Sequence, residues 1–299
     1  MSDQASRLRN LLEQRAELEA QAREIGDLYF GMAEETRVIA VTSGKGGVGK
    51  TNLAVNLAVD LQQSGKRVMI IDADIGTANV NLLMGSVTNR SLIHLLDDGV
   101  QLEDVVEEGT AGVKYISGVA GVEAALTLNR AQQKRLHKKL SRCSEMADII
   151  IIDTGAGLNR NVVEFILASE EVILITTPEP PALADAYAVI KAYSLYTHRR
   201  NIKIVVNRIH EEEECAEVIE KINQTTKKFL NLTVECLGYI YEDKNVLESV
   251  RKQVPFVVTK PNSPAARCIH ELSNSLLSGT KMSSVSKGWR AFLDKLFGS

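Results

Sequence analysis

The segment Gly44–Thr51 reads GKGGVGKT, between a β-branched run over 38–42 and a helical pattern over 50–64. Glycines in such a segment let backbone N–H groups converge on phosphate oxygens without Cβ clashes, and the N-terminus of the following helix attracts an anion. In this pattern Lys50 contacts the β- and γ-phosphates, and the Thr51 hydroxyl contacts Mg²⁺. A glycine-rich surface turn is the alternative, but the strand–loop–helix order favours a phosphate loop that binds ATP.

Apolar runs alternate with helical patterns along most of the chain. β-branched runs cover 38–42, 67–72, 149–153, 172–176 and 202–206, and further strands are expected near 113–117 and 234–239. Helical patterns cover 50–64, 130–146, 181–196, 213–230 and 262–278. Short continuous β-branched runs are typical of strands covered on both faces, and their alternation with helices implies right-handed crossovers. We therefore predict an α/β fold with a doubly wound, mostly parallel sheet.

Composition predicts a helix at each end of this domain. Residues 1–34 form a helical appendage, 35–278 one P-loop domain without a composition break, and 279–299 a small, polar tether followed by an amphipathic helix. The helix places its large apolar side chains in one arc, namely Trp289, Phe292, Leu293, Leu296 and Phe297.

Charge and cysteine usage exclude several classes of protein. A formal net charge of -3 argues against a global positive field that coats nucleic acid, so no specific nucleic-acid partner is expected. Cys143, Cys215, Cys236 and Cys268 form no CxxC pair, which suits reduced thiols better than a disulfide framework or a metal cage. Neither a signal-peptide core nor an apolar run of roughly 20 residues is present, so we expect a cytoplasmic protein.

Lys45 makes the phosphate loop unusual, because a second lysine repels Lys50 unless more anion is present. A solvated lysine is the alternative. The KGGVGKT segment, Lys45 to Thr51, resembles the deviant Walker A motif of the MinD/ParA family, and the resemblance covers about 37–260. In that family the extra lysine crosses a dimer interface to the partner's nucleotide. The resemblance implies an ATP-dependent homodimer in which Lys45 stabilises the transferring phosphoryl group in trans.

Two carboxylates follow expected strands. By resemblance, Asp74 orients or accepts a proton from the attacking water, within a first switch over 72–79; Asn81 replaces a family aspartate, so no role is assigned there. Asp153 ends a Walker B-like strand and can hold Mg²⁺. A turn-forming aspartate and a plain core strand are the alternatives. The implied catalytic residues are Lys45, Lys50 and Asp74, and the implied Mg²⁺ ligands are Thr51, Asp74 and Asp153.

The resemblance also implies nucleotide and partner contacts beyond the loop. Asn207, with Arg208, stands where the family reads adenine, although an asparagine at a strand end is more often a turn cap. Glu179 matches a carboxylate that approaches the partner's nucleotide, and Asp185 matches a position used for regulator binding. The implied ATP contacts are Gly44, Lys45, Gly46, Gly47, Val48, Gly49, Lys50, Thr51, Asn52, Glu179, Asn207 and Arg208.

Two segments narrow the resemblance to the flagellar-number branch of the family, called FlhG or FleN. Residues 153–157 read DTGAG, where many MinD relatives carry Ser-Pro. Residues 3–9 read DQASRLR and match the DQAxxLR signature of a helix that stimulates the flagellar signal-recognition GTPase FlhF. Carried over, Gln4 acts near the partner's nucleotide, Leu8 is the apolar anchor, and Arg9 belongs to the same contact.

The C-terminal helix is expected to bind the inner face of the cell membrane reversibly. It is about 18 Å long, too short to span a bilayer but able to lie in its surface. Lys287, Arg290 and Lys295 suit anionic headgroups, and two helices held in one ATP-bound dimer gain through effective concentration. Packing on its own domain is the alternative.

The first hypothesis is therefore an ATPase that sets the number and placement of flagella, with flagellar switch or C-ring proteins as further partners. A division-site MinD ATPase shares the C-terminal helix and is the closest alternative. A ParA-like partition ATPase should show a basic surface. An iron–sulfur carrier of the nitrogenase iron-protein type needs paired interface cysteines, and the sequence offers no convincing pair.

Overall fold

A computed structural model describes residues 36–74, 79–86, 90–118, 129–197, 201–278 and 288–297. Contacts within the chain divide it into two units, Met1–Glu35 and Thr36–Ser299. The first unit lies outside the described residues, and with it the helix expected over 1–34 and its residues Gln4, Leu8 and Arg9. The fold below is that of the second unit.

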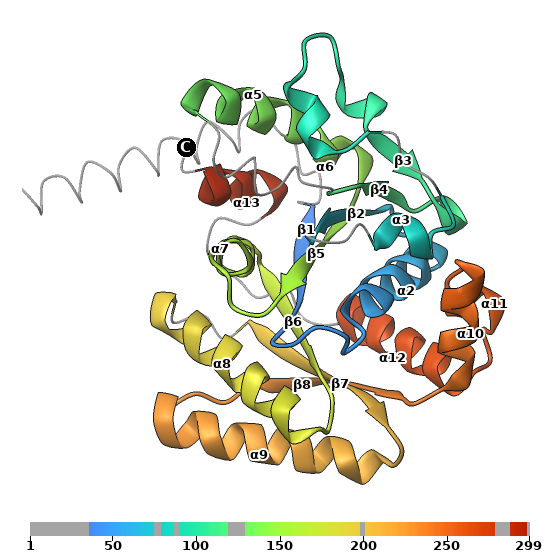
Figure 1. Ribbon diagram of the computed structural model, residues 1–299, viewed down its shortest axis with the longest axis vertical. Coiled ribbons are helices and arrows are strands. Elements are labelled where there is room, and N and C mark those ends of the chain that lie inside the picture. The colour runs from blue at the N-terminus through green and yellow to red at the C-terminus, as the bar shows by residue number, and fades with distance from the viewer. Residues whose placement is uncertain are drawn as a thin grey trace, which may run out of the picture. The chain divides into compact units, whose positions relative to one another are not determined.

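The described strands form one eight-stranded sheet in the order β3-β4-β2-β5-β1-β6-β7-β8 (Figure 1). All neighbouring pairs are parallel except β3 with β4. The strands are β1 (Arg37–Ser43), β2 (Val68–Ala73), β3 (Val106–Glu108), β4 (Lys114–Ile116), β5 (Ile149–Ala156), β6 (Glu171–Thr176), β7 (Ile202–Ile209) and β8 (Glu235–Tyr241). This arrangement confirms the predicted doubly wound, mostly parallel sheet.

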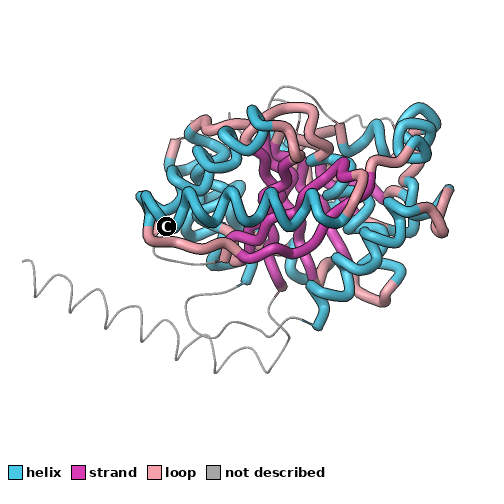
Figure 2. The backbone as a smooth tube through the Cα atoms, turned by 90° about the horizontal axis from the view of Figure 1, so that it is seen from below, coloured by secondary structure: helices cyan, strands magenta, loops and turns pink. Residues whose placement is uncertain are grey.

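Helices connect the strands and cover both faces of the sheet, so that the strands run through the middle of the domain (Figure 2). They are α2 (Lys50–Gln63), α3 (Val80–Leu83), α5 (Arg130–Leu140), α6 (Cys143–Met146), α7 (Arg160–Ala168), α8 (Pro180–Tyr196), α9 (Glu212–Leu230), α10 (Lys244–Lys252), α11 (Phe256–Thr259), α12 (Pro264–Ser278) and α13 (Gly288–Phe297). Three short 3₁₀ helices are η1 (Leu92–Leu96), η2 (Leu102–Asp104) and η3 (Thr110–Gly112).

Alternate residues of each strand face opposite layers. In β1, Ile39 and Val41 belong to the core cluster that includes α2 and α12, whereas Val38 belongs to the cluster that includes α5 and α13, and Ala40 to the cluster that includes α7, α8 and α9. Because apolar helix faces cover both sides of the sheet, the side chains of the central strands are apolar on both sides, and apolar and polar residues do not alternate along them. That is why continuous β-branched runs predicted their positions well.

Short elements were not predicted. β3 is three residues long and antiparallel, at the edge of the sheet, and α7 and α10, at nine residues each, are shorter than the helices that were expected. The single helix expected over 130–146 is broken into α5 and α6 by a turn at Ser141–Arg142. Tertiary packing, rather than local periodicity, stabilises such pieces.

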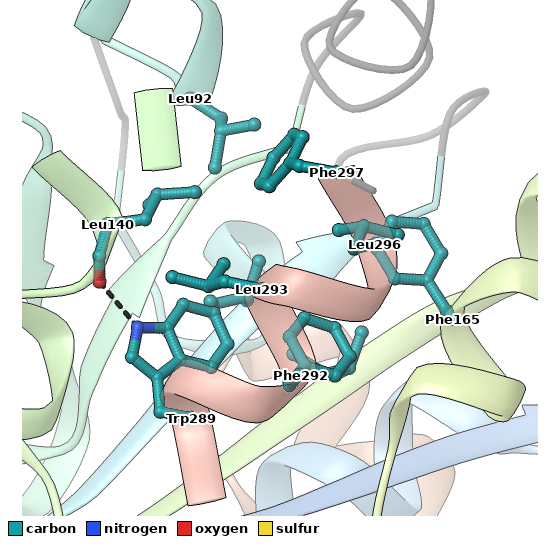
Figure 3. A pocket seen from close by; sticks show the side chains of 10 residues that line it. Leu92, Leu140, Phe165, Trp289, Phe292, Leu293, Leu296 and Phe297 are labelled. Atoms are coloured by element: carbon teal, nitrogen blue, oxygen red, sulfur yellow. Dashed lines mark hydrogen bonds between the residues drawn. The ribbon is translucent and has the colours of Figure 1, made fainter. Parts of the chain in front are cut away.

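In this structure α13 packs on its own domain, the arrangement given above as the alternative to a membrane-bound helix. Trp289, Phe292 and Leu293 are at most 2% exposed. They lie in the groove between α5 and α7, with Leu140 and Phe165 on either side (Figure 3). Ile71 of β2 and Ile152 of β5 line the same groove. The reason is that apolar side chains of the sheet between α5 and α7 would otherwise face water, so the burial stabilises both the helix and the sheet. Membrane binding by this helix stays a prediction.

Specific contacts hold α13 in its groove. The indole N–H of Trp289 donates a hydrogen bond to the carbonyl of Leu140, and the ring stacks on Phe292 at 5.1 Å between centroids. His137 of α5 lies 2.9 Å from Asp294. Leu296 and Phe297 remain half-buried. No helix among the described residues is both long and apolar enough to cross a membrane.

Candidate functional site

The candidate site lies where three neighbouring strands end. β5 lies between β1 and β2 and pairs with both. Asp153 of β5 lies opposite Val41 of β1 on one side and opposite Asp72 of β2 on the other. Because the three strands are parallel, the segments after their carboxyl ends meet at one edge of the sheet. An open α/β sheet binds ligands at such an edge. The sheet order thus brings together the phosphate loop and both predicted acidic segments.

The phosphate loop turns from β1 directly into α2. Gly49 precedes the helix with a φ of 100°, in the left-handed region where a side chain is strained. A Cβ on Gly49 would also lie 2.4 Å from the Asn207 amide nitrogen. The helix begins at Lys50, so its free N–H groups and positive dipole end face the loop. This geometry can bind a phosphate anion.

Lys50 is held between two carboxylates. Its Nζ lies 2.8 Å from Oδ1 of Asp153 and 3.5 Å from Oδ2 of Asp74, and its side chain is only 7% exposed. Burial alone would lower the pKa of Lys50, but the two carboxylates raise it overall. The lysine is therefore cationic, and a bound phosphate would compete with Asp153 and Asp74 for its charge.

Asp153 fits the predicted Mg²⁺ role. Burial raises the pKa of its fully buried carboxyl, and the attraction of Lys50 acts against this. Its Oδ2 finds no hydrogen-bond partner among the described residues. Thr51, in the first turn of α2, supplies a hydroxyl beside it, and Asp74 a second carboxylate. These are the oxygen donors that Mg²⁺ prefers, and phosphate oxygens and water would complete its octahedron. Mg²⁺ would supply charge stabilisation to the phosphates there.

Asp72 has a structural role that we did not predict from the sequence. Its carboxylate accepts hydrogen bonds from the backbone N–H groups of Asp74 at 3.1 Å, Asn79 at 3.2 Å and Val80 at 3.4 Å. It thereby ties both ends of the predicted first switch to β2; residues 75–78 lie outside the described residues. Burial, and then the nearby Asp153, raise the pKa of Asp72 to about 7. The sequence feature that could have indicated this role is the Asp-x-Asp spacing at the end of a strand.

Lys45 stands apart from the buried cluster. Its side chain is exposed, and its backbone carbonyl accepts a hydrogen bond of 2.9 Å from the hydroxyl of Ser43. An exposed cation on the outer side of the phosphate loop is free to reach a second molecule. The trans role of Lys45 stays a prediction.

Asn207 and Arg208 both contact the loop rather than standing clear of it. The Asn207 amide donates to the carbonyl of Val48 at 2.7 Å, and the Arg208 guanidinium donates to the carbonyl of Gly47 at 3.1 Å. Arg208 has a φ of 61° and also lies 3.7 Å from Glu242. The two residues therefore couple the end of β7 to the phosphate loop, and adenine recognition by Asn207 stays a prediction.

α8 packs tightly on the start of the loop. A Cβ on Gly44 would lie 2.3 Å from the backbone carbon of Asp185, so only glycine fits there. Asp185 is half-buried at this contact, while Glu179 is exposed just before α8 and accepts from the Thr177 hydroxyl at 3.2 Å. The Gly44–Asp185 contact has no signal in the sequence, because the two residues are distant along the chain.

Comparisons with known proteins agree with this geometry. Residues 36–206 match the model of a protein family described as an AAA domain. The chain is 36% identical over 237 residues to the antiactivator FleN of Pseudomonas aeruginosa, covering 79% of this chain and 85% of FleN. It is 29% identical to the flagellum site-determining protein YlxH of Helicobacter pylori, covering 99% of this chain and 98% of YlxH.

Solved structures show the same fold. A chain of the MinC:MinD cell division protein complex of Aquifex aeolicus is 25% identical, with a TM-score of 0.67, over 84% of this chain and 100% of that one. The septum site-determining protein MinD of Pyrococcus horikoshii, complexed with Mg-ADP, is 28% identical, with a TM-score of 0.65, over 81% and 97%. The phosphate loop, the acidic residues at the strand ends and the similarity to these relatives all indicate the same family. We conclude that the chain is an ATPase of the MinD/ParA family, in the group that includes FleN and YlxH.

Proposed function

We propose that this ATPase regulates flagellar number and placement by cycling between a monomer and an ATP-bound dimer. The observation that supports the proposal is the different burial of the two lysines. Lys50 is buried between Asp74 and Asp153, whereas Lys45 is exposed on the same loop. Similarity to FleN and YlxH, whose names state flagellar roles, supports the choice of process.

In the proposed cycle, the γ-phosphate of ATP takes the ammonium group of Lys50 in place of its carboxylates. Asp153 and Thr51 would then hold Mg²⁺, which would stabilise the phosphate charge, and Asp74 orients the attacking water. Lys45 then reaches the nucleotide of a second molecule and stabilises the charge of the transferring phosphoryl group. Asn207 and Glu179 complete the nucleotide contacts, and Asp185 on α8 takes part in regulator binding.

The proposed membrane contact requires α13 to leave its groove. Full burial of each large apolar side chain contributes roughly 1.5–3 kcal/mol, so release of Trp289, Phe292 and Leu293 is costly without compensation. Insertion among lipids returns part of this free energy, and pairing two helices in one dimer raises their effective concentration at the membrane. The half-buried Leu296 and Phe297 would be the first to detach. A reversible peripheral attachment follows.

Stimulation of an FlhF-type GTPase through residues 1–34 distinguishes this proposal from a division-site MinD function. The DQASRLR segment over 3–9 supports it. The test is to add a synthetic peptide of residues 1–23 to purified, GTP-loaded FlhF and measure phosphate release. We expect faster hydrolysis, and a slower rate with a Gln4→Ala peptide. A rate unchanged by the natural peptide would instead favour the MinD alternative.

A further inference from the structure

Two cysteines outside the nucleotide site lie side by side. The Sγ atoms of Cys215 and Cys236 are 3.7 Å apart, although the residues belong to different elements, the first turn of α9 and the edge strand β8. Cys143 and Cys268 are buried elsewhere, in α6 and α12. Neither of these two neighbouring thiols takes part in the proposed ATP hydrolysis.

The local structure aims both side chains at the same place. Cys215 packs with Val218 and Ile222 on the inner face of α9, and Val234, directly before β8, joins the same cluster. The 3.7 Å between the sulfur atoms shows that the side chain of Cys236 also faces α9. β8 then has a bulge: Ile204 pairs with Cys236 and Val205 with Gly238, which leaves Leu237 unpaired. The bulge interrupts the regular ladder directly after Cys236, and pairing resumes at Gly238.

The two thiols differ in access to solvent. Cys236 is exposed at the edge of the sheet, whereas Cys215 is only 6% exposed. The hydrogen bond between the two sulfur atoms lowers the pKa of Cys236 to about 7. A thiolate is the nucleophilic form of cysteine. An exposed, readily ionised sulfur with a second thiol behind it resembles the attacking and resolving pair of a redox-sensitive site.

We propose that Cys215 and Cys236 are a modification site that forms a reversible disulfide on exposure to a small-molecule disulfide of the glutathione class. The Cys236 thiolate attacks one sulfur of the oxidant, forms a mixed disulfide and expels one reduced thiolate, which takes up a proton. Cys215 loses its proton to solvent, attacks the Cys236 sulfur and expels the second thiolate. Two protein thiols are oxidised to one disulfide, and the oxidant is reduced to two thiols.

The crosslink would fasten α9 to the edge strand. Tyr241 of β8 already donates a hydrogen bond of 3.0 Å to Glu212 of α9, close to the same junction. A covalent bond there closes a loop that runs through α9 and back along β8. Closing such a loop removes conformational freedom from the unfolded chain, so the oxidised protein should melt at a higher temperature.

The test treats the full-length protein with oxidised glutathione and measures its intact mass and thermal midpoint. We expect the mass to fall by two hydrogen atoms without a retained glutathione, and peptide mapping to find the two cysteines linked. The midpoint should rise by on the order of 5 °C and return on addition of dithiothreitol.

Variants separate the steps. Cys215→Ser should stop at the mixed disulfide and retain one glutathione on Cys236, whereas Cys236→Ser should remain unmodified. Cys268→Ser is the matched control and should behave as the wild type. The proposal is overturned if the wild type keeps both thiols free, if it retains the glutathione adduct as Cys215→Ser does, or if Cys236 links two chains instead.

Discussion

The ammonium group of Lys50 lies 2.8 Å from Oδ1 of Asp153, so the phosphate-loop lysine is neutralised by the carboxylate of the neighbouring strand β5. Both groups are almost fully buried, and burying one of them alone would be costly. Phosphate binding must therefore exchange one partner of Lys50 for another rather than simply add a charge. That exchange would leave Asp153 available to hold Mg²⁺, so we expect phosphate binding and Mg²⁺ binding to be coupled.

Replacing Lys45 with alanine should reduce ATP hydrolysis, on the order of 100-fold or more, while ATP binding persists. The reason is that the exposed Lys45 lies outside the buried cluster that surrounds Lys50. Steady-state phosphate release and equilibrium binding of a labelled ATP analogue measure the two effects. Lys227→Ala, an exposed lysine in the last turn of α9, is the control. Wild-type turnover in Lys45→Ala would remove the trans-lysine role.

Replacing Gly44 with alanine should destabilise the domain by about 1–3 kcal/mol and weaken nucleotide binding. The added methyl group would lie 2.3 Å from the backbone of Asp185, so α8 must move away from the loop. Chemical denaturation without nucleotide measures the free energy of unfolding. Gly46→Ala is a matched control in the same loop, because its Cβ would meet no atom within 4 Å. Equal stabilities of the two variants would show that α8 yields without cost.

The raised pKa of Asp72 predicts a pH-dependent stability. Its folded pKa of about 7 exceeds its ordinary value of 3.8, so between these values the folded state binds more protons than the unfolded state. The free energy of unfolding should therefore fall as pH rises towards 7, and the penalty should stay constant above it. Asp72→Asn removes the buried charge and should lessen this fall, with an effect on the order of 2–4 kcal/mol at about pH 8.

The measurement is denaturation from about pH 5 to about pH 8, without nucleotide and with a magnesium chelator. Asp97→Asn, which removes an exposed carboxylate, should follow the wild-type pH dependence. A parallel pH dependence in Asp72→Asn and the wild type would mean that Asp72 ionises without penalty in the folded protein.

The sole tryptophan of the chain, Trp289, reports directly on α13. Without nucleotide its fluorescence should resist an aqueous quencher, since the ring is 2% exposed. With ATP, Mg²⁺ and anionic vesicles, lipids brominated on their chains should quench it, and the protein should co-sediment. Deletion of 286–299 should abolish sedimentation. If Trp289 stays protected from lipid quenchers in ATP, the membrane proposal fails and α13 is a permanent part of the core.

Much of the site could be predicted from local patterns, because its residues follow strands whose β-branched runs are unmistakable. Lys50, Asp74 and Asp153 each stand at such a position, and parallel strands bring their carboxyl ends together. The contacts of Gly44 with Asp185, and of Asn207 with the loop, could not be predicted. They join segments far apart in the sequence, and local periodicity does not encode such approaches.

The sequence by itself determined the phosphate loop, the parallel α/β architecture and the amphipathic character of 289–297, since each depends on residue type and spacing within one segment. Tertiary structure alone decided what the apolar arc of α13 covers and where Cys215 meets Cys236. An apolar stripe records that a side must be buried, but not against what. The partner is set by the groove between α5 and α7, which exists only once the sheet has formed.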